Sequence, residues 1–209
     1  LRMQNPYWIA YRNLRTNNKK RYMLSASLSY DITDWLNVSG RVRVDNSNTK
    51  YEQKLYASSN TTLTEGSTQG FYAIAKPDES QVYADVLANI NKRFGDYSLV
   101  VNVGASIVDN KYDELSYRGP IRANGIPNVF NVFDLDNTQK KARQDEWEEQ
   151  TQSIFASAEL GWKSMLYLTL TGRNDWASQL ANSSSTCFFY PSVGLSAIIS
   201  EMVKLPSAI

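Results

Sequence analysis

Strict alternation of apolar and polar side chains is the feature that most constrains this chain. In the segment 166–171, leucines at the even positions are separated by Tyr or Thr at the odd positions. A period of two puts the two kinds of side chain on opposite faces of an extended strand, whereas a helix would wind both around its surface. A polar loop is expected to open at 172–176 and to run to Cys187, and a second alternating strand returns over 189–199. The segment 166–199 therefore predicts a β-hairpin.

The same alternation recurs through most of the 209 residues. Further strands are predicted from it before the hairpin, and the apolar residues of each share one face. Asp34 supplies the turn chemistry for one reversal, and Gly95 with Asp96 supplies it for another. The predicted strands cover approximately residues 20–33, 36–45, 82–93, 97–107, 153–162, 166–171 and 189–199.

The connections between these strands alternate in length. Outer-membrane β-barrels have short turns at one end and long loops at the other, whereas both ends of a soluble β-sandwich face water and have no reason to differ. The short turns are 34–35, 95–96 and 163–164, and the longer segments are 46–80, 109–150 and 174–187. We therefore predict an all-β fold, an antiparallel up-and-down transmembrane β-barrel segment with short periplasmic turns and long extracellular loops.

The composition of the two strand faces also favours a membrane environment. The apolar face carries a single charge, Lys92, which lies beside Phe94 near a short turn, where a long cation can reach the membrane interface. The opposite face is rich in Ser, Asn, Gly and Thr with a few charged residues, which suits a water-filled lumen. Aromatic residues flank every short turn, as interfacial girdles do: Trp35, Phe94, Tyr97, Trp162 and Tyr167.

The composition argues against several function classes. The balance of 22 basic and 21 acidic residues gives no nucleic-acid signature, and no nucleic-acid partner is predicted. The chain has no His and one cysteine, Cys187, so it lacks the commonest general base and the commonest metal ligand. Carboxylates such as Asp113 and Glu114 have no partner that could separate their pKa values. No cofactor, metal site or catalytic residue is predicted, and the chain is not expected to be an enzyme.

Two stretches carry a resemblance to a known family. The sequence 172–176 (GRNDW), followed by 190–196 (YPSVGLS) and then by Ser200 and Glu201, resembles the barrel of SusC/RagA-type TonB-linked outer-membrane transporters of Bacteroidetes. The segments 5–8 (NPYW) and 34–36 (DWL) look like earlier parts of the same barrel. The first of these motifs is specific, and the likeness extends over nearly the whole chain.

The resemblance implies a barrel of roughly 22 strands plugged by an N-terminal domain. Such a protein lies in the outer membrane of a Gram-negative bacterium, contacts its lipid, and imports oligosaccharides or peptides with energy from the TonB complex and with a SusD-like lipoprotein lid. Seven strands cannot close around a plug. We therefore expect residues 1–209 to be a partial barrel domain that lacks the plug, the TonB-contacting segment and the barrel C-terminus.

Two sets of residues are candidates for a functional site. The first comprises charged residues on the lumen face, which could contact a plug or a passing ligand or could instead pair with one another across strands: Arg41, Arg43, Asp85, Arg93, Glu159 and Arg173. The second comprises aromatic residues of the long segments, which could stack on sugars or could pack the loops themselves: Tyr72, Tyr112, Tyr117 and Trp147.

Two further patterns in the long segments allow more than one interpretation. Asp134, Asp136 and Asn137 resemble the start of a calcium loop, but Gln139 stands where the turn glycine belongs and no bidentate Glu follows. The charged run 140–149 is either a short helix or an extension of the next strand.

Two alternative functions remain beside the transporter. The first is a soluble β-sandwich module that binds glycans or acts as an adhesin through its loops. The second, with weaker support, is a β-rich glycosidase.

Overall fold

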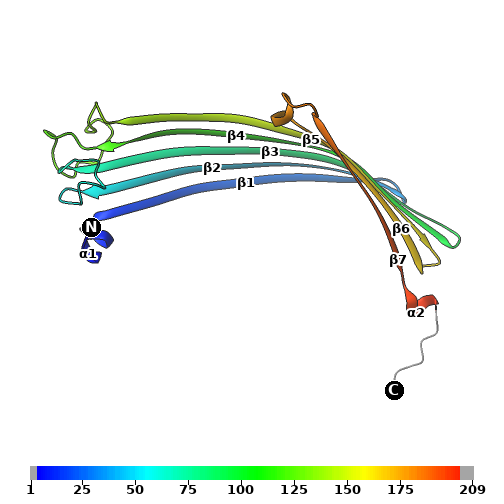
Figure 1. The fold of residues 1–209 in the computed structure, drawn as a ribbon. Coiled ribbons are helices and arrows are strands. Elements are labelled where there is room, and N and C mark those ends of the chain that lie inside the picture. The colour runs from blue at the N-terminus through cyan, green and yellow to red at the C-terminus, as the bar shows by residue number, and fades with distance from the viewer. Residues whose placement is uncertain (1–3, 203–209) are drawn as a thin grey trace, which may run out of the picture. The chain divides into compact units, whose positions relative to one another are not determined.

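The computed structural model describes residues 4–202, which form one seven-stranded sheet with strand order β1-β2-β3-β4-β5-β6-β7 (Figure 1). Every strand is a neighbour of the strands that precede and follow it in the chain, which is the predicted antiparallel up-and-down topology. The strands are β1 (Asn13–Thr33), β2 (Leu36–Tyr56), β3 (Gly70–Phe94), β4 (Tyr97–Pro120), β5 (Lys141–Trp162), β6 (Leu166–Ala177) and β7 (Cys187–Ala197). Three short helices accompany them: α1 (Pro6–Arg12), η1 (Ser178–Leu180) and α2 (Ile199–Met202).

The two faces of the sheet separate side chains as the alternation predicts. In the register of β5, β6 and β7, Ala158 lies opposite Leu170, which lies opposite Val193. The neighbouring row on the other face joins Ser157, Thr171 and Ser192. We call the first of these the outer face and the second the inner face. No helix among residues 4–202 has the length and apolar character needed to cross a membrane.

Several strands are longer than the alternation predicts. The segments 46–80 and 109–150 were expected to be loops, but β2 continues to Tyr56, β3 begins at Gly70, β4 continues to Pro120 and β5 begins at Lys141. Only 57–69 and 121–140 remain as connections. The prediction was wrong here because both faces of these extensions carry polar residues, so the period of two disappears from the sequence while backbone pairing continues. The run 140–149 extends β5, which was one of its two predicted conformations.

The polar stretch 172–176 is also strand and not the start of a loop. In β6, Gly172 pairs with Ala156 of β5 and with Pro191 of β7, and the pairing continues to Ala177. Pairing to strands on both sides satisfies the backbone groups, so polar side chains do not end the strand. The connection to β7 is correspondingly shorter, residues 178–186, and β7 ends at Ala197, before the predicted end at Ile199.

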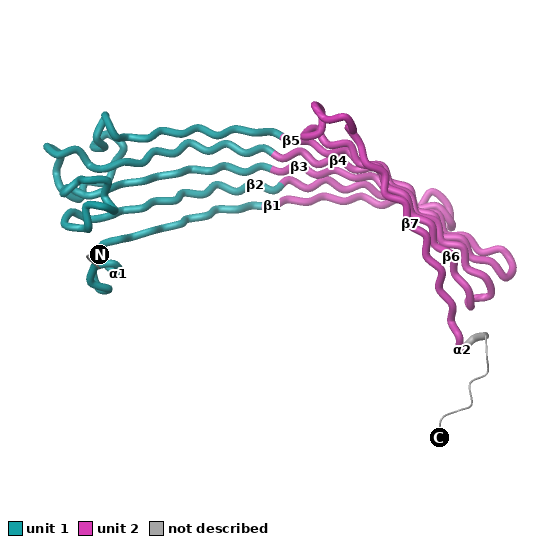
Figure 2. Tube along the Cα trace, viewed as in Figure 1, with its two compact units in different colours: residues 1–22, 45–80, 111–148 teal, residues 23–44, 81–110, 149–209 magenta. Residues whose placement is uncertain are grey.

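The chain divides into two compact units, coloured separately in Figure 2. Unit 1 comprises residues 1–22, 45–80 and 111–148, and unit 2 comprises 23–44, 81–110 and 149–209. The strands β1 to β5 contribute residues to both units. The boundaries fall close to the last apolar outer-face residues, such as Val44, Val82 and Ile107. The outer-face alternation is therefore a property of unit 2.

Unit 2 distributes its side chains in the reverse of the way a soluble protein does. Its outer face exposes large apolar side chains even on interior strands, with Val86 50% and Ile154 54% exposed. The residues that unit 2 buries, among those the structure describes, are Gly104, Ser153 and Gly161. A sheet that exposes its apolar side chains and shields small and polar ones is suited to hydrocarbon outside and water inside.

Unit 1 contains the apolar core of the described chain, and the two long connections build it. The connection 121–140 folds back so that Ile121 and Leu135 form a β-bridge, and the Ile121 N–H donates to the Gly70 carbonyl over 2.9 Å. Gly70 has a φ of 119°, and a Cβ there would lie 2.7 Å from the Leu55 carbonyl oxygen, so this position requires glycine. The buried apolar side chains are Leu55, Phe71, Tyr72, Ile121 and Leu135.

The short turns have the predicted chemistry. Gly95 has a positive φ of 61°, and Lys163 and Ser164 have φ values of 51° and 58°. The predicted interfacial residues meet beside two of these turns. Lys92 lies 5.3 Å from the ring centre of Trp35, and Phe94 stacks on Tyr97 at 6.4 Å.

Gly104 on the inner face of β4 provides a test of the packing in unit 2. A Cβ there would lie 2.6 Å from the Phe155 ring and 2.9 Å from the backbone oxygen of Val86, which cannot move aside. We predict that Gly104→Ala destabilises the full-length protein by about 1–3 kcal/mol, the usual cost of overpacking. Thermal unfolding in detergent measures this. The matched control is Gly194→Ala, whose Cβ would meet only Thr169 at 3.8 Å. Equal unfolding midpoints for the two variants would contradict the packing described here.

Candidate functional site

The inner face of β2 and β3 gathers three of the predicted charged residues. Arg41 donates from Nε to Asp85 over 2.9 Å and from a terminal nitrogen over 2.7 Å. The guanidinium groups of Arg41 and Arg43 lie 5.4 and 5.3 Å from the ring centre of Tyr83. Arg43 also donates to the Gln81 side-chain oxygen over 3.4 Å. Arg41 and Asp85 therefore pair with each other across β2 and β3, whereas the partners of Arg43 are an amide and an aromatic ring.

Arg173 makes a second centre on the inner face, between β5 and β6. Its Nε donates to Asp175 over 2.7 Å, and another guanidinium nitrogen donates to Ser153 over 3.0 Å. The guanidinium also lies 5.9 Å from the centre of the Phe155 ring. Hydrogen bonds to two side chains, together with the contact to an aromatic ring, hold the guanidinium group in one orientation.

The two remaining predicted charges lie apart from these centres. Glu159 on β5 accepts from the Thr169 hydroxyl over 3.4 Å. Arg93 is exposed near the short turn at Gly95, and it makes no ion pair within residues 4–202. The structure therefore does not bring all six predicted charges into one site.

Amide and hydroxyl groups link the strands of the inner face between these charges. The Asn89 side chain donates to Asn102 over 2.5 Å, and Asn102 donates to Ser157 over 3.1 Å. Gln81 donates to Asn110 over 2.8 Å, and Asn110 donates to Glu149 over 3.1 Å. Each of these two series of hydrogen bonds connects three strands. We call these two chains of hydrogen bonds the amide ladders.

Sequence reasoning missed the amide ladders because single Asn and Gln residues carry no motif. Their signal was present but diffuse: amides recur on the polar face of successive predicted strands. Which amide meets which depends on the register between strands, and alternation alone does not give the register.

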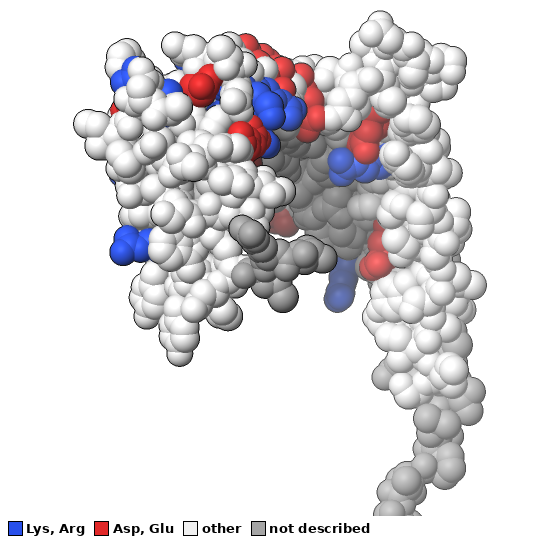
Figure 3. All heavy atoms as spheres, turned by 60° about the vertical axis from the view of Figure 1, so that its left-hand side comes forward, with Lys and Arg blue, Asp and Glu red and all other residues white. Residues whose placement is uncertain are grey.

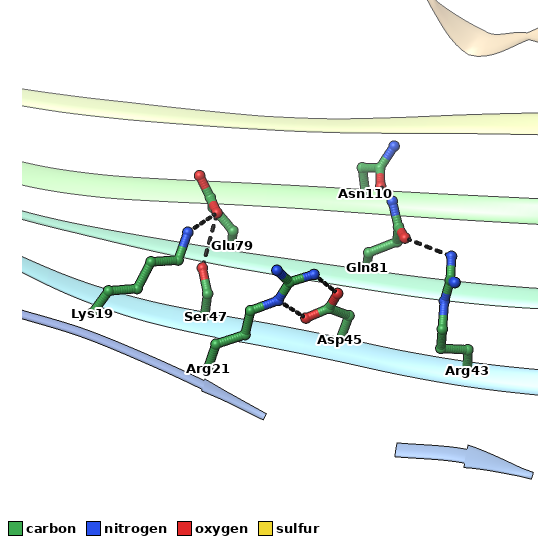
Figure 4. A network of polar contacts seen from close by, with 8 residues as sticks. All are labelled: Lys19, Arg21, Arg43, Asp45, Ser47, Glu79, Gln81 and Asn110. Carbon is green, nitrogen blue, oxygen red and sulfur yellow. Dashed lines mark hydrogen bonds and ion pairs between the residues drawn. The ribbon is translucent and has the colours of Figure 1, made fainter. Parts of the chain in front are cut away.

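Unit 1 has an ion-pair network of its own on the inner face (Figure 4). Arg21 makes a forked contact with Asp45, 2.8 Å from its Nε and 2.5 Å from a terminal nitrogen. Glu79 accepts from Lys19 over 3.4 Å and from the Ser47 hydroxyl over 2.9 Å. The contacts of Glu79 with Lys19 and Ser47 were not predicted, because residues 46–80 were taken to be a loop. Figure 4 also shows the contacts of Arg43, Gln81 and Asn110 in unit 2.

Charged side chains are distributed unevenly over the surface (Figure 3). β7 has no charged residue.

Two of the four predicted loop aromatics meet in unit 1. The rings of Tyr112 and Trp147 stack with centres 5.5 Å apart and planes 10° apart, and Trp147 is 47% exposed. The Tyr112 hydroxyl donates to Glu114 over 2.5 Å. This hydrogen bond to a carboxylate, with a smaller contribution from burial, raises the pKa of Tyr112 to about 12. The pair is therefore a fixed aromatic platform with one open face, and we call it the aromatic platform.

The other two predicted aromatics are placed differently. Tyr72 is only 3% exposed, packs against Phe130 with ring centres 6.1 Å apart, and donates to Glu52 over 2.7 Å. Burial and the Glu52 carboxylate both raise the pKa of Tyr72. Tyr72 packs the connection, which was the alternative to sugar stacking. Tyr117 is half-buried and lines a groove of unit 1.

That groove encloses about 320 Å³ and lies beside the connection 57–69. Glu65 of this connection accepts from Arg118 over 2.8 Å and lies 3.5 Å from the Lys141 ammonium. The hydrogen bond from Arg118 lowers the pKa of Glu65 against an opposing effect of burial, and Lys141 lowers it further. The lining combines carboxylates, a guanidinium and aromatic edges: Tyr51, Glu65, Phe71, Glu114, Tyr117 and Arg118.

The carboxylates that resembled a calcium loop have protein partners. Asp134 accepts from Arg122 over 2.7 Å, and Asp136 accepts from both the hydroxyl and the N–H of Thr138, which lowers the pKa of Asp136. Residues 4–202 contain no group of three His, Cys, Asp or Glu side chains placed to hold a metal ion.

Comparison with known proteins identifies the architecture. A family model described as TonB dependent receptor-like, beta-barrel matches residues 2–202. No curated protein sequence matches the chain.

Solved structures with the same fold include the RagAB peptide transporter, with a TM-score of 0.81 and 14% identity over 98% of this chain and 22% of that one. The RagAB peptide importer in the open-open state gives 0.72 and 15% identity, over 92% and 21%. BauA, the ferric preacinetobactin receptor from Acinetobacter baumannii, gives 0.56 and 18% identity, over 87% and 28%. The chain thus spans 22% of the length of the first of these structures, and the likeness is one of fold.

The ion pairs of Glu65 predict that the stability of the folded connection 57–69 depends on pH. Because the pKa of Glu65 in the folded protein is below its ordinary value of 4.5, its ion pairs contribute fully above pH 4.5 and are lost as the pH falls through the lowered value. At pH 7 we expect Glu65→Gln to raise amide hydrogen exchange in residues 57–69 roughly two- to fivefold, the effect of one partly exposed ion pair. Hydrogen-exchange mass spectrometry of the full-length protein measures this, with exposed Glu146→Gln as the control. Unchanged exchange in Glu65→Gln would contradict the role of these ion pairs.

Proposed function

Because the chain belongs to the TonB-dependent receptor-like β-barrel family, we propose that its strands form one arc of the barrel of an outer-membrane transporter. In this proposal residues 1–209 are part of a barrel of roughly 22 strands, and further strands pair with β1 and β7. An N-terminal plug, which other parts of the protein supply, occupies the lumen.

The reversed polarity of unit 2 is the observation that carries the proposal. Its interior strands expose Val and Ile on the outer face and join Asn, Ser and Gln into hydrogen bonds on the inner face. In water such a sheet would leave a large apolar surface uncovered, whereas in a bilayer the same surface is solvated by lipid. Nothing comparable favours the soluble sandwich, because a sandwich buries its apolar face against a second sheet.

We propose that the cargo is an oligosaccharide or a peptide, imported with energy from the TonB complex and with a SusD-like lipoprotein at the extracellular side. Both cargo classes are rich in hydrogen-bond donors and acceptors, which the amide ladders could exchange with a passing solute. The RagAB structures, whose names specify a peptide transporter, support this proposal through the shared fold. BauA, the ferric preacinetobactin receptor, has the same fold at a lower TM-score, so the fold by itself leaves the cargo open.

Within this proposal the aromatic platform is the candidate cargo contact. Stacking on Tyr112 holds the Trp147 ring in place before any ligand arrives, so little side-chain freedom is lost on binding. A flat, exposed indole can stack on a sugar ring or on a peptide side chain.

We predict that Trp147→Ala lowers uptake by the full-length transporter roughly three- to tenfold, the usual worth of one aromatic contact. Panels of single oligosaccharides and of peptides, supplied as sole nutrient to cells that depend on this protein, first identify the cargo class. Initial uptake of a labelled member of that class is then compared between variants.

The matched control is Phe133→Ala, which removes a loop aromatic that is 80% exposed and does not belong to the aromatic platform. Trp147→Phe is expected to keep most of the uptake, since a planar ring remains. If Trp147→Ala and Phe133→Ala transport cargo at the same rate as the parent, the aromatic platform is not a cargo contact. If no compound in either panel requires the protein for uptake, the proposed function is wrong.

A further inference from the structure

The groove of unit 1 beside the connection 57–69 is lined in part by two small side chains. Ala73 and Ala75 of β3 border it, and both stand at odd-numbered positions of that strand. Glu79, also at an odd-numbered position of β3, contacts Lys19 and Ser47 on the inner face. The groove therefore includes the inner face of β3, and we call it the alanine groove.

The walls of the alanine groove combine apolar and charged side chains. Tyr51 of β2 and Leu63 of the connection 57–69 belong to the apolar part, whereas Glu114 and Arg118 of β4 and Glu65 of the connection are charged. The enclosed volume of about 320 Å³ is at the lower end of the range for small-molecule sites. A space of this size suits one residue of a longer cargo chain.

Glu114 differs from the other charged residues of the alanine groove because it has no ion pair within residues 4–202. Glu65 and Arg118 bind each other over 2.8 Å, and the Lys141 ammonium lies 3.5 Å from Glu65. The half-buried Glu114 carboxylate accepts a hydrogen bond from the neutral Tyr112 hydroxyl. This hydrogen bond also joins the alanine groove to the aromatic platform.

The basic residues near Glu114 are bound to other carboxylates. Arg143 of β5 interacts electrostatically with Glu114, but its guanidinium binds Asp145 over 2.5 Å. Arg118 lies four residues along β4 from Glu114, roughly 13 Å away at about 3.3 Å per residue, and it is bound to Glu65. A carboxylate that is partly withdrawn from water and has no counter-ion of its own favours a bound cation.

We propose that the alanine groove binds a lysine or arginine side chain of a peptide cargo, with Glu114 as the counter-ion. The inference rests on the proposed function, in which the inner face lines the cargo path, and deepens it by specifying the cargo residue. A basic side chain has a long apolar stem and a charged end. The stem suits contact with Ala73, Ala75 and Leu63, and the charged end suits Glu114.

Sugars match the alanine groove less well than a basic side chain does. A neutral sugar would shield the Glu114 carboxylate from water without supplying a counter-ion, which is unfavourable. An amino sugar has a cation, but it carries the ammonium group directly on the ring and lacks the apolar stem. The combination of an apolar wall with one unpaired carboxylate therefore favours a basic amino-acid side chain.

The test measures peptide binding to the full-length protein in detergent by saturation-transfer NMR, which detects weak ligands. The probe is a pentapeptide with one lysine between glycines and with both ends blocked, so that the lysine carries its only charge. The matched neutral peptide contains Nε-acetyl-lysine in place of lysine. We expect the lysine peptide to bind about ten times more tightly, the effect of one hydrogen bond between charged groups. Equal affinity for the two peptides, or binding of neither, would overturn the proposal.

Two substitutions at neighbouring positions of β4 separate Glu114 from general charge effects. Glu114→Gln removes the charge, but its side-chain oxygen can still accept from the Tyr112 hydroxyl, and we expect this variant to bind both peptides equally. Asp113→Asn removes the same charge on the opposite face of the strand, and we expect it to keep the tenfold preference of the parent. The same preference in both variants would contradict the role of Glu114.

Ala75→Leu tests the space in the alanine groove without changing any charge. We expect this variant to bind the lysine peptide no more tightly than the parent binds the neutral peptide. Affinity at the parent level would show that the lysine contacts the protein outside the groove. A glucosamine trimer and an N-acetylglucosamine trimer test the amino-sugar alternative. Tighter binding of the glucosamine trimer than of the lysine peptide would assign the groove to amino sugars and overturn the proposal.

Failure of this inference differs from failure of the proposed function. Equal uptake of the lysine and acetyl-lysine peptides, unchanged in Glu114→Gln, would show that the alanine groove does not select cargo and would leave the transporter in place. If no compound in either cargo panel requires the protein for uptake, the proposed function is wrong. The NMR affinities decide the ligand of the alanine groove in either case.

Discussion

The hydrogen-bonding requirement of the backbone is the constraint that organises this structure. Peptide groups in hydrocarbon have no water to bond with, so each must pair within the protein, and a sheet meets this demand by pairing every strand with its neighbours. Sheet pairing in turn makes side chains alternate between two faces. One face can then be mainly apolar and the other mainly polar, as in unit 2, where Ala158, Leu170 and Val193 form one row and Ser157, Thr171 and Ser192 the next.

This constraint also explains which parts of the fold were predictable from the sequence. Where lipid contacts one face, as along 97–107, every second residue must be apolar and the period of two is visible in the sequence. Beyond Ile107 both faces of β4 carry polar residues, so the strand continues to Pro120 with no periodic signal. The same argument covers the missed extensions of β2, β3 and β5. The stretch 172–176 was misjudged for a related reason, because its polar side chains were taken to mark a loop.

The candidate site was less predictable because it depends on register and on long-range packing. Alternation correctly placed Arg41 and Asp85 on one face, but only the pairing of β2 with β3 shows that they bind each other. Arg21 and Asp45 both belong to predicted strands and to their polar faces, but only the register between β1 and β2 shows that they form an ion pair. Burial of Tyr72 results from the fold of the connection 121–140, which local sequence patterns do not determine. Tyr112 and Trp147, which are 35 positions apart in the sequence, meet because β4 and β5 are neighbours.

The proposed transporter barrel requires that lipid contacts the outer face of unit 2 and that water contacts its inner face. A nitroxide scan along β4 tests this most directly: in a Cys187→Ser background of the full-length protein in lipid vesicles, single cysteines replace the successive residues from Leu99 to Ile107 except Gly104, which has no room for a side chain. Collision rates with oxygen, which concentrates in hydrocarbon, and with a polar nickel chelate, which stays in water, are measured at each site. We predict that the two rates alternate with a period of two and in opposite phase, with oxygen highest at Val101 and Val103 and nickel highest at Asn102 and Ser106. Equal access of the nickel chelate to all of these positions would contradict the assignment of lipid to the outer face and water to the inner face.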